Sequence, residues 1–310
     1  MSRTALADRR AMEQFVGVDI GGTAVKLGIC SGAGSVLARS TVAFERAARP
    51  DDMLDRIAAA VGALVANAGT VRACGVGIPG ELDAERRSLR SAINLPEWKD
   101  VAIPRLLSSR IGIPVVVEND GNCAAWGESR AGAGRGVRTL ALFTLGTGVG
   151  GGIVLDGELW TGAGGAAGAL GHLVIDPAGP ICGCGQRGCL QQFASATAIS
   201  RRFGGGSAEA AFEAAHRGDA DGTAAIAEAC EALAIAAADV IHMLQPDLLV
   251  LGGGLTGAGD NLLVPVRERV RRHVRATWLE HTRIELAALG GDAGWIGAAL
   301  FAGHSVSATS

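Results

Sequence analysis

The 310-residue sequence lacks an excess of charge of either sign, since 28 basic and 31 acidic residues leave a net charge of -3. So small a charge gives no large field to attract nucleic acid or an anionic membrane, although a local basic patch stays open. Charged residues make up only 19%, against 48% apolar residues and 47 glycines, which is the composition of a compact globular chain. We therefore predict a globular protein without nucleic acid among its partners.

The sequence also lacks a segment typical of membrane proteins or secretion. The uncharged stretch at residues 139–155 is divided by glycines, and this pattern predicts two strands and a turn instead of a membrane span. Residues 1–10 carry three arginines, but no long apolar region follows them as it would in a signal peptide. We predict a cytoplasmic protein that does not act at a membrane.

Cysteine is sparse, and its seven copies do not look like a secreted disulfide framework. Three lie close together at Cys182, Cys184 and Cys189, and His172 precedes them by ten residues. One imidazole and three thiolates suit a closed tetrahedral Zn²⁺ site, whose function would be structural because no coordination position is left open. The alternatives are thiols that lie near one another by chance, or a redox pair of Cys182 and Cys184, although a single intervening residue is not the usual redox spacing.

Hydrophobic periodicity predicts an α/β chain in which one theme occurs twice. In the first half, strands and helices are expected at residues 15–30, 36–42, 53–68, 71–78, 113–118 and 122–131. In the second half they are expected at residues 139–155, 221–244, 248–251, 260–274, 284–287 and 295–302. Two similar lobes follow, each with helices on a mixed sheet, and the cleft between them is the expected ligand site.

Two hairpin turns combine glycines with a hydroxyl side chain, DIGGTAVK (19–26) and TLGTGVG (144–150). Glycine turns let backbone N–H groups approach phosphate oxygens without interference from a Cβ atom. Asp19 could hold Mg²⁺, and Lys26 is one of only two lysines in the chain. Tight β-turns without a ligand are the alternative.

The segment VENDGN (117–122) ends a predicted strand and begins a predicted helix, which places Asp120 at a helix N-terminus. The helix dipole favours an ionised carboxylate there, ready to accept the proton of a hydroxyl that attacks phosphorus. A structural N-cap is the alternative.

Taken together and in this order, these segments resemble the ROK family of bacterial sugar kinases and sugar-responsive repressors, over residues 16–302. The resemblance is carried by DIGGTAVK (19–26), GIPGELD (77–83), INLPEW (93–98), VENDGNCAAWGE (117–128), TLGTGVGGG (144–152), GHLVIDPAGPICGCGQRGCL (171–190) and LGGG (251–254). It implies a two-lobed, actin/hexokinase-like (ribonuclease H-like) α/β fold, with mixed sheets flanked by helices and a structural zinc site. The expected domains are a small lobe at residues 13–120, onto which a helix at about 295–305 packs back, and a larger, zinc-bearing lobe at 121–294.

The resemblance further implies an ATP-dependent kinase that phosphorylates a hexose, usually on the 6-hydroxyl, with Asp120 as the general base. The residues expected at the sugar are Gly80, Glu81, Asn94, Asn119, Asp120, His172 and Gln191. Those expected at the phosphates, Mg²⁺ and adenosine are Asp19, Gly21, Gly22, Thr23, Lys26, Gly146, Thr147, Gly148, Gly253 and Gly254. By analogy the protein would be a homo-oligomer, either a dimer or a tetramer.

Two positions depart from the family pattern, because Ala169 and Gln191 stand where family kinases have glutamates that contact the sugar. Glu81 adds an acid after Gly80, so we predict a changed sugar specificity, with 3-amino-3-deoxyglucose as a candidate substrate. An ordinary glucokinase and a non-catalytic sugar-binding or regulatory protein are the alternatives. A repressor needs a helix-turn-helix domain, and only about fifteen residues precede the first glycine turn, so we do not expect one.

Overall fold

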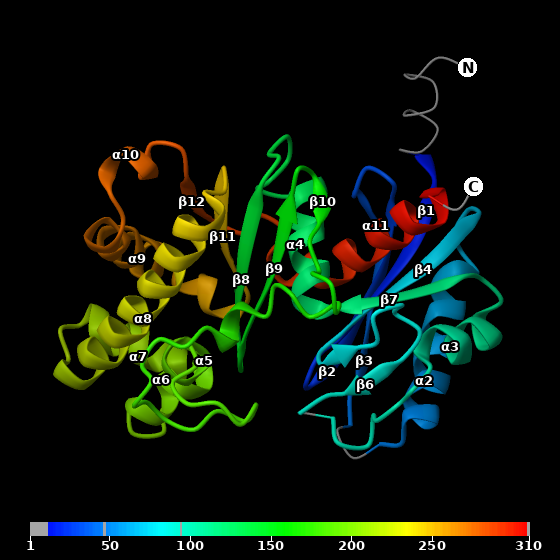
Figure 1. The fold of residues 1–310 in the computed structure, drawn as a ribbon. Coiled ribbons are helices and arrows are strands. Elements are labelled where there is room, and N and C mark those ends of the chain that lie inside the picture. The colour runs from blue at the N-terminus through cyan, green and yellow to red at the C-terminus, as the bar shows by residue number, and fades with distance from the viewer. Residues whose placement is uncertain (1–11, 46–47, 94, 309–310) are drawn as a thin grey trace. The chain divides into compact units, whose positions relative to one another are not determined.

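The computed structural model describes residues 12–45, 48–93 and 95–308, which form two compact units (Figure 1). Unit 1 takes the described parts of Met1–Gly136, Leu159–Ala167 and Asp292–Ser310, and unit 2 takes Val137–Glu158 and Gly168–Gly291. The first boundary lies after Gly136 instead of after residue 120, because helix α4 (Asp120–Ala131) packs along α11 (Ala293–Ala308) within unit 1.

Unit 1 is built on a five-stranded sheet of order β3-β2-β1-β4-β7. Its strands are β1 (Gln14–Ile20), β2 (Ala24–Ser31), β3 (Val36–Ala43), β4 (Val71–Ile78) and β7 (Val115–Asn119). The first three pair as antiparallel hairpins, whereas β1, β4 and β7 are parallel. Since parallel strands need a crossover, helices α2 (Pro50–Val65) and α3 (Ile103–Ile111) lie in the two connections.

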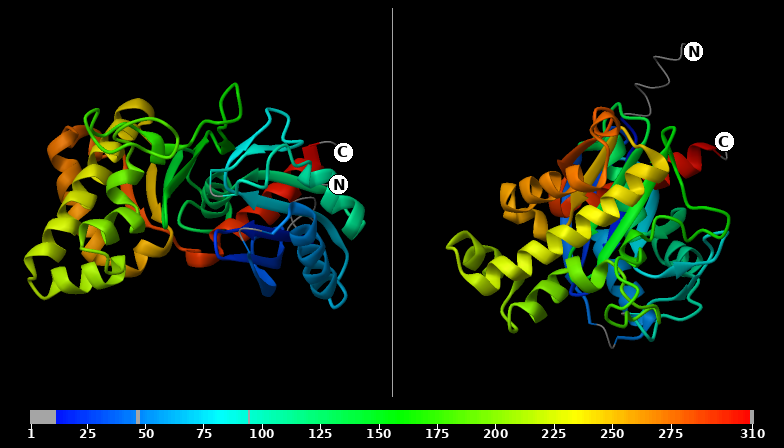
Figure 2. Two further views of the ribbon diagram at one scale, coloured as in Figure 1. Left: turned by 90° about the horizontal axis from the view of Figure 1, so that it is seen from below. Right: turned by 60° about the vertical axis from the view of Figure 1, so that its left-hand side comes forward.

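The two faces of strand β1 meet different parts of unit 1, because side chains alternate along a strand. Val16, Val18 and Ile20 belong to the apolar core that also includes residues of α2. Gly17 faces the other way, where a Cβ atom would lie 1.8 Å from the carbonyl oxygen of Trp295. Glycine at this position therefore lets α11 lie directly on the sheet, as the red helix in Figure 2 shows.

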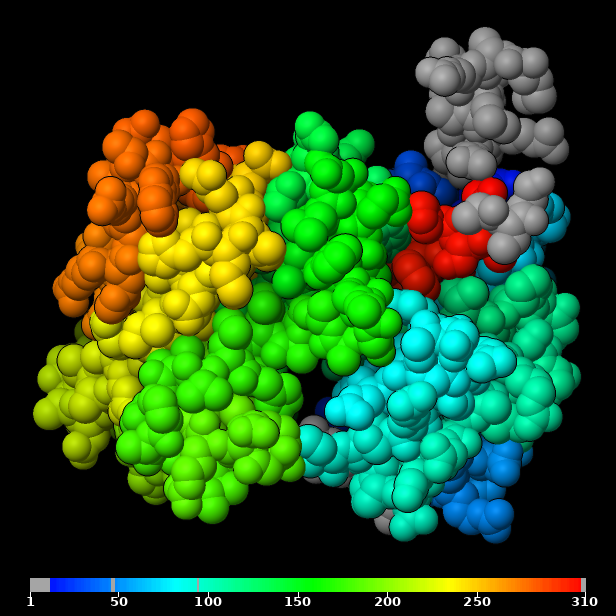
Figure 3. Space-filling model, viewed as in Figure 1, coloured from blue at the N-terminus to red at the C-terminus, as the bar shows by residue number. Residues whose placement is uncertain are grey.

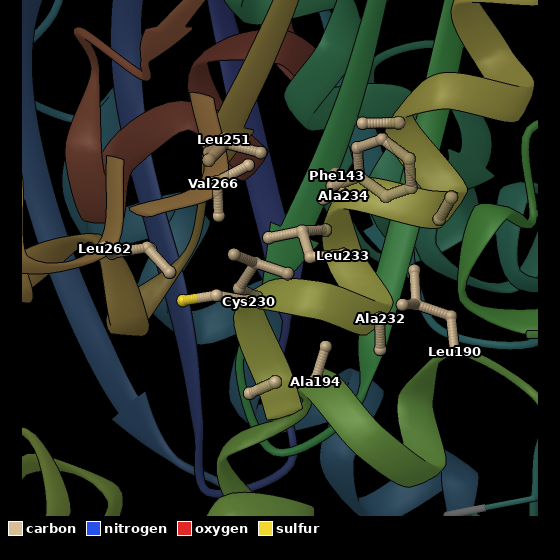
Figure 4. Close-up of a cluster of buried hydrophobic side chains, with 14 of the residues drawn as sticks. Phe143, Leu190, Ala194, Cys230, Ala232, Leu233, Ala234, Leu251, Leu262 and Val266 are labelled. Carbon is tan, nitrogen blue, oxygen red and sulfur yellow. The ribbon is translucent and has the colours of Figure 1, made fainter. Parts of the chain in front are cut away.

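Unit 2 has the sheet order β10-β9-β8-β11-β12. Its strands are β8 (Leu140–Leu145), β9 (Val149–Leu155), β10 (Glu158–Leu159), β11 (Leu248–Gly252) and β12 (Arg283–Leu286). The first two form an antiparallel hairpin, and β8, β11 and β12 are parallel. The long helix α8 (Ala220–Leu244) ends before Pro246 and places Cys230 and Leu233 in the core cluster (Figure 4).

Several shorter elements were not among those predicted from the sequence. They are α3, the hairpin of β5 (Glu81–Leu82) and β6 (Leu89–Ser91), α5 (Gln191–Ala194), α6 (Ala196–Arg202), α7 (Ala208–His216) and α10 (Ala276–Leu279). Helix α9 (Asp260–His273) lies where a helix was expected, and 3₁₀ turns η1 (Leu170–His172), η2 (Gly254–Ala258) and η3 (Gly290–Asp292) complete the described elements. Within residues 12–45, 48–93 and 95–308, no helix has both the length and the hydropathy that crossing a membrane requires.

Candidate functional site

The hairpin turn after β1 carries a carboxylate whose pKa is strongly perturbed. Asp19 is the register partner of Lys26 across the hairpin, and the N–H of Gly21 closes the turn on the carbonyl of Ala24 at 3.0 Å. At the start of α11, a Cβ atom on Gly294 would lie 2.6 Å from Asp19 Oδ2, so only glycine leaves room for the carboxylate. Burial raises the pKa of Asp19 to about 7, with a smaller contribution from Asp120 and opposition from Lys26.

Strand β7 leads directly into helix α4 (Figure 1), and two predicted site residues, Asn119 and Asp120, meet at this junction. Asn119 is the N-cap of α4, and its Oδ1 accepts from the N–H groups of Gly121 at 2.9 Å and Asn122 at 3.3 Å. Asp120 is therefore the first residue of the helix and not its cap. Its side chain is half-buried.

The electrostatics of Asp120 differ from the sequence-based expectation. The helix N-terminus was expected to keep this carboxylate ionised, and the N–H of Gly121 does lower its pKa. Desolvation by burial is the larger effect, and the pKa of Asp120 is raised above the ordinary value for aspartate. A raised pKa makes the carboxylate a stronger base once its proton has left.

The segment after β4 approaches the same junction. Gly80 has φ of +117°, and a Cβ atom there would lie 2.4 Å from the carbonyl oxygen of Ser91, so glycine is required. The carbonyl of Gly80 accepts a hydrogen bond from Asn119 Nδ2 at 3.3 Å. Glu81 follows and is exposed, in a segment that lies at the surface of unit 1 (cyan in Figure 3). Asn94 lies outside the described residues.

A buried ion pair beside this junction was not predicted from the sequence. Glu118 has a side chain that is only 1% exposed, and its Oε2 accepts from Nε of Arg86. A signal for Glu118 did exist, because a charge at the end of a valine-rich strand needs a partner. Arg86 gave no comparable signal, since it lies 32 residues away in sequence.

The glycine turn between β8 and β9 is held by helix α6 in unit 2. The N–H of Gly146 donates to the carbonyl of Gly148 at 2.9 Å and closes the turn. The carbonyl of Gly146 accepts from the N–H of Ala196 at 2.8 Å, and that of Thr147 accepts from the Thr197 hydroxyl at 2.7 Å. Helix α6 therefore fixes the conformation of this turn by donating hydrogen bonds to two carbonyl groups of the turn.

A cavity of about 400 Å³ adjoins the glycines that follow β11. Gly253 has φ of +86° and packs on the backbone of Leu145, while Gly254 lies in the cavity wall. The other lining residues come mainly from α7 and η2: Glu209, Phe212, Glu213, His216, Leu255, Gly257, Ala258 and Asn261. This volume suits a small-molecule ligand, and sequence reasoning missed the contribution of α7.

The predicted metal ligands lie together in unit 2, with their ligand atoms all within 4.8 Å of one another: His172, Cys182, Cys184 and Cys189. The Sγ atoms of Cys184 and Cys189 are 3.7 Å apart, and Cys182 Sγ lies 3.8 Å from His172 Nδ1. Zn–S bonds of about 2.3 Å in a tetrahedral site require donor atoms about 3.8 Å apart. The donor set therefore fits a four-coordinate metal ion.

Gln191 lies against this cluster. Its Nε2 donates to Cys182 Sγ at 2.8 Å, and its Oε1 is 3.1 Å from where a Cβ atom on Gly148 would be. Ala169, the other departure from the family pattern, is exposed at the start of η1. The sugar contacts expected for His172 and Gln191 stay predictions.

Comparisons with known proteins agree with one another. The sequence profile of the ROK family matches residues 15–304. A glucokinase of Thermotoga maritima is 37% identical over 92% of this chain and 96% of its own length, and an N-acetylmannosamine kinase of Escherichia coli is 32% identical over 92% and 97%. The crystal structure of a ROK family glucokinase from Streptomyces griseus in complex with glucose and AMPPNP superposes with a TM-score of 0.83, at 34% identity over 93% of this chain and 99% of that one.

Proposed function

The chain belongs to the ROK family, and from this premise we propose that it transfers the terminal phosphoryl group of ATP to a hydroxyl group of a hexose. It is an ATP-dependent sugar kinase, in line with the glucokinases and the sugar kinase that it resembles over nearly its whole length. The observation that carries the proposal is the start of α4, where half-buried Asp120 follows Asn119 and raises the pKa of a second carboxylate, Asp19.

Asp120 acts as the general base in this proposal. As the sugar oxygen bonds to the γ-phosphorus of ATP, the bond from that phosphorus to the bridging oxygen breaks, ADP leaves, and Asp120 takes the hydroxyl proton. The 6-hydroxyl is the position that the family resemblance favours. Asn119 supports the substrate, because one hydrogen of its amide is donated to Gly80 and the second is available for a sugar hydroxyl.

The phosphate groups would be bound by glycine turns. Asp19, whose pKa Asp120 raises, fits the oxygen donors that Mg²⁺ prefers, and bound Mg²⁺ would neutralise part of the phosphate charge. Lys26 and the backbone of Gly21, Gly22 and Thr23 are the phosphate contacts that we propose in unit 1. In unit 2 we assign phosphate binding to Gly146, Thr147 and Gly148, and the nucleoside to the cavity beside Gly253 and Gly254.

The cysteine cluster is assigned a structural Zn²⁺ ion. Its support is the set of donor distances, which suit tetrahedral coordination by His172 and three thiolates. All four positions are then taken by the protein, so the ion would hold the segment 172–189 together and would leave no position for a substrate.

The sugar is the least constrained part of the proposal, and two candidates stand. An exposed Glu81 beside Gly80 favours a hexose derivative with an ammonium group, such as 3-amino-3-deoxyglucose. Identity of 37% to a glucokinase favours glucose itself. Glu81 separates the two, because its carboxylate has a partner of opposite charge only in the first.

The test is ADP release from Mg-ATP with glucose, mannose, N-acetylmannosamine and 2- and 3-amino sugars, for the wild-type protein and Glu81→Gln. We expect turnover by the wild-type protein, with a preference for an amino sugar that Glu81→Gln reduces about tenfold, the effect of one charge-assisted hydrogen bond. An unchanged preference would contradict the amino-sugar assignment and leave glucose. Sugar binding without turnover across the panel would contradict the kinase and support a sugar-binding protein.

A further inference from the structure

Glu118 is a buried carboxylate that the proposed reaction does not use. It lies next to the end of β7, and its Oε1 accepts from the N–H of Asn119 at 2.8 Å and from Asn122 Nδ2 at 2.9 Å. Its Oε2 accepts from Nε of Arg86. A carboxylate at 1% exposure is unfavourable unless it is both paired and hydrogen-bonded. Arg86 therefore supplies the positively charged partner that this buried side chain needs.

The turn that carries Arg86 holds it in an uncommon conformation. Arg86 has φ of 55°, in the left-handed region that non-glycine residues seldom adopt. Asp83 organises the turn, since its carbonyl accepts from the N–H of Arg86 at 2.9 Å and its carboxylate accepts from Arg87 N at 2.6 Å and Ser88 Oγ at 2.8 Å. A strained residue held by so many bonds is typical of functional positions.

We propose that Arg86 and Glu118 are positioning residues for phosphoryl transfer, an inference that rests on the proposed function. Glu118 accepts hydrogen bonds from the backbone of Asn119 and the side chain of Asn122, which flank Asp120 in sequence. The position of Glu118 therefore determines where the chain passes from β7 into α4, and with it the position of Asp120. The same carboxylate is tied through Arg86 to the turn of hairpin β5–β6.

A second bond joins the same two segments, from Asn119 Nδ2 to the carbonyl of Gly80, the residue before β5. Hairpin β5–β6 begins with Glu81, which we propose to face the sugar. The two ties keep this hairpin and the general base in a fixed relation. Loss of the ion pair should loosen the orientation of the base toward the sugar hydroxyl, to which reaction rates are very sensitive.

The test compares Arg86→Met with Arg87→Met. Arg87 is the matched control, because it lies in the same turn but pairs with Glu85 through side chains that are 76% and 62% exposed, where an ion pair contributes little. We expect Arg86→Met to lower kcat by about 10- to 100-fold with an unchanged KM for ATP, and Arg87→Met to leave both as they are. Arg86→Lys should recover part of kcat because it retains the charge. If the role of the pair were purely structural, Arg86→Met would lower Tm but leave kcat per folded molecule unchanged. Arg86→Lys would then have no loss of kcat to recover.

Hydrogen exchange of segment 115–125 gives a readout that does not depend on turnover. We expect faster exchange in Arg86→Met than in Arg87→Met. Where Arg86→Met does not fold, the double variant Arg86→Met/Glu118→Gln removes both charges, and its kcat should still be at least tenfold below that of the wild-type protein. Equal kcat and equal exchange in the Arg86 variant, single or double, and in the control would overturn the inference. Absence of turnover by the wild-type protein would count against the proposed function alone, and the exchange result would still decide on the pair.

Discussion

The two units share a sheet order but differ in the charge that they place at corresponding positions. Both begin with an antiparallel hairpin and continue with two parallel strands. In unit 1 the first turn is flanked by Asp19 and Lys26, and the last strand of the sheet leads into Asp120. In unit 2 the corresponding turn contains only glycine and threonine, and the last strand ends at Leu286.

The repeated backbone arrangement therefore serves two kinds of chemistry. Unit 1 bears the cost of half-buried carboxylates, whose pKa values burial raises. Unit 2 offers backbone groups, a cavity and a set of metal ligands. We therefore expect proton transfer to depend on unit 1, and binding of the nucleoside and metal-dependent stability to depend on unit 2.

Removing the carboxylate of Asp120 should have the largest effect. Asp120→Asn keeps the size and most hydrogen bonds of the side chain but cannot accept a proton, so kcat should fall about 10²- to 10⁴-fold with little change in sugar affinity. ADP release and calorimetric sugar binding measure the two quantities. Asp156→Asn, which removes an exposed carboxylate from unit 2, is the control. A kcat above one tenth of the wild-type value would contradict the proposed division of roles, because proton transfer would then not need the carboxylate of unit 1.

Metal removal should act on unit 2. Cys184→Ser, or a strong chelator, should lower Tm by at least about 5 °C, because metal binding contributes directly to folding. Limited proteolysis should then cut within residues 172–190 while fragments of unit 1 stay intact. A chelator should have no further effect on Cys184→Ser, which controls for chelation elsewhere. An unchanged Tm with no metal found by elemental analysis would contradict the structural metal.

The parts of the site that were predictable from the sequence are those that occupy short continuous segments. Residue type and spacing alone indicated the turn that contains Asp19 and Lys26, and they also indicated the cysteine cluster. In both cases the residues lie close together in the structure. The repeated succession of hairpin strands, helices and further strands along the chain was likewise visible in the hydrophobic pattern. The nine-residue helix α3 was missed because it is too short for a sustained periodic signal.

The remaining parts depend on contacts between distant segments. Arg86 contacts Glu118 from a turn in which its backbone is left-handed. No residue type in that segment predicts this backbone conformation. The cavity in unit 2 needs α7, a helix of ordinary composition. The direction of the pKa shift at Asp120 was also not predictable, since it depends on how much of the carboxylate the fold buries.

A substitution at Gln191 distinguishes a metal-supporting role from a sugar-binding role within unit 2. Gln191→Glu replaces an N–H donor to Cys182 with a carboxylate that repels the thiolate, so metal affinity should fall about 10- to 100-fold. Chelator competition measures the affinity, and Gln192→Glu is the adjacent control. Unchanged metal affinity with a lower KM for glucose would instead support the sugar contact expected from the sequence.

A substitution in the wall of the cavity beside Gly254 should weaken binding of the nucleotide and leave binding of the sugar unchanged. His216→Ala removes an exposed ring from its wall and should raise the KM for ATP about fivefold, the value of one hydrogen bond or stacking contact. The KM for the sugar, measured in the same assay, should not change. A rise confined to the sugar KM would contradict the assignment of the cavity to the nucleoside.

The ionised carboxylate of Asp19 should lower the free energy of unfolding of unit 1, whereas the corresponding turn of unit 2 has no carboxylate. Its pKa is raised from 3.8 to about 7, so between these values the folded protein binds more protons at this side chain than the unfolded chain does. Stability is therefore lost as pH rises through this interval, and the loss is complete above it.

Asp19→Asn should accordingly raise Tm by about 2–4 °C at pH 8 and by less at pH 5, when Mg²⁺ and nucleotide are absent. Thermal unfolding at the two pH values measures this, with Asp156→Asn again as the control for charge alone. An equal shift of Tm at both pH values would mean that the shape of the side chain, and not its charge, determines the change in stability. A fall in Tm at pH 8 would mean that attraction to Lys26 outweighs burial, and the contrast in charge between the units would then carry no cost.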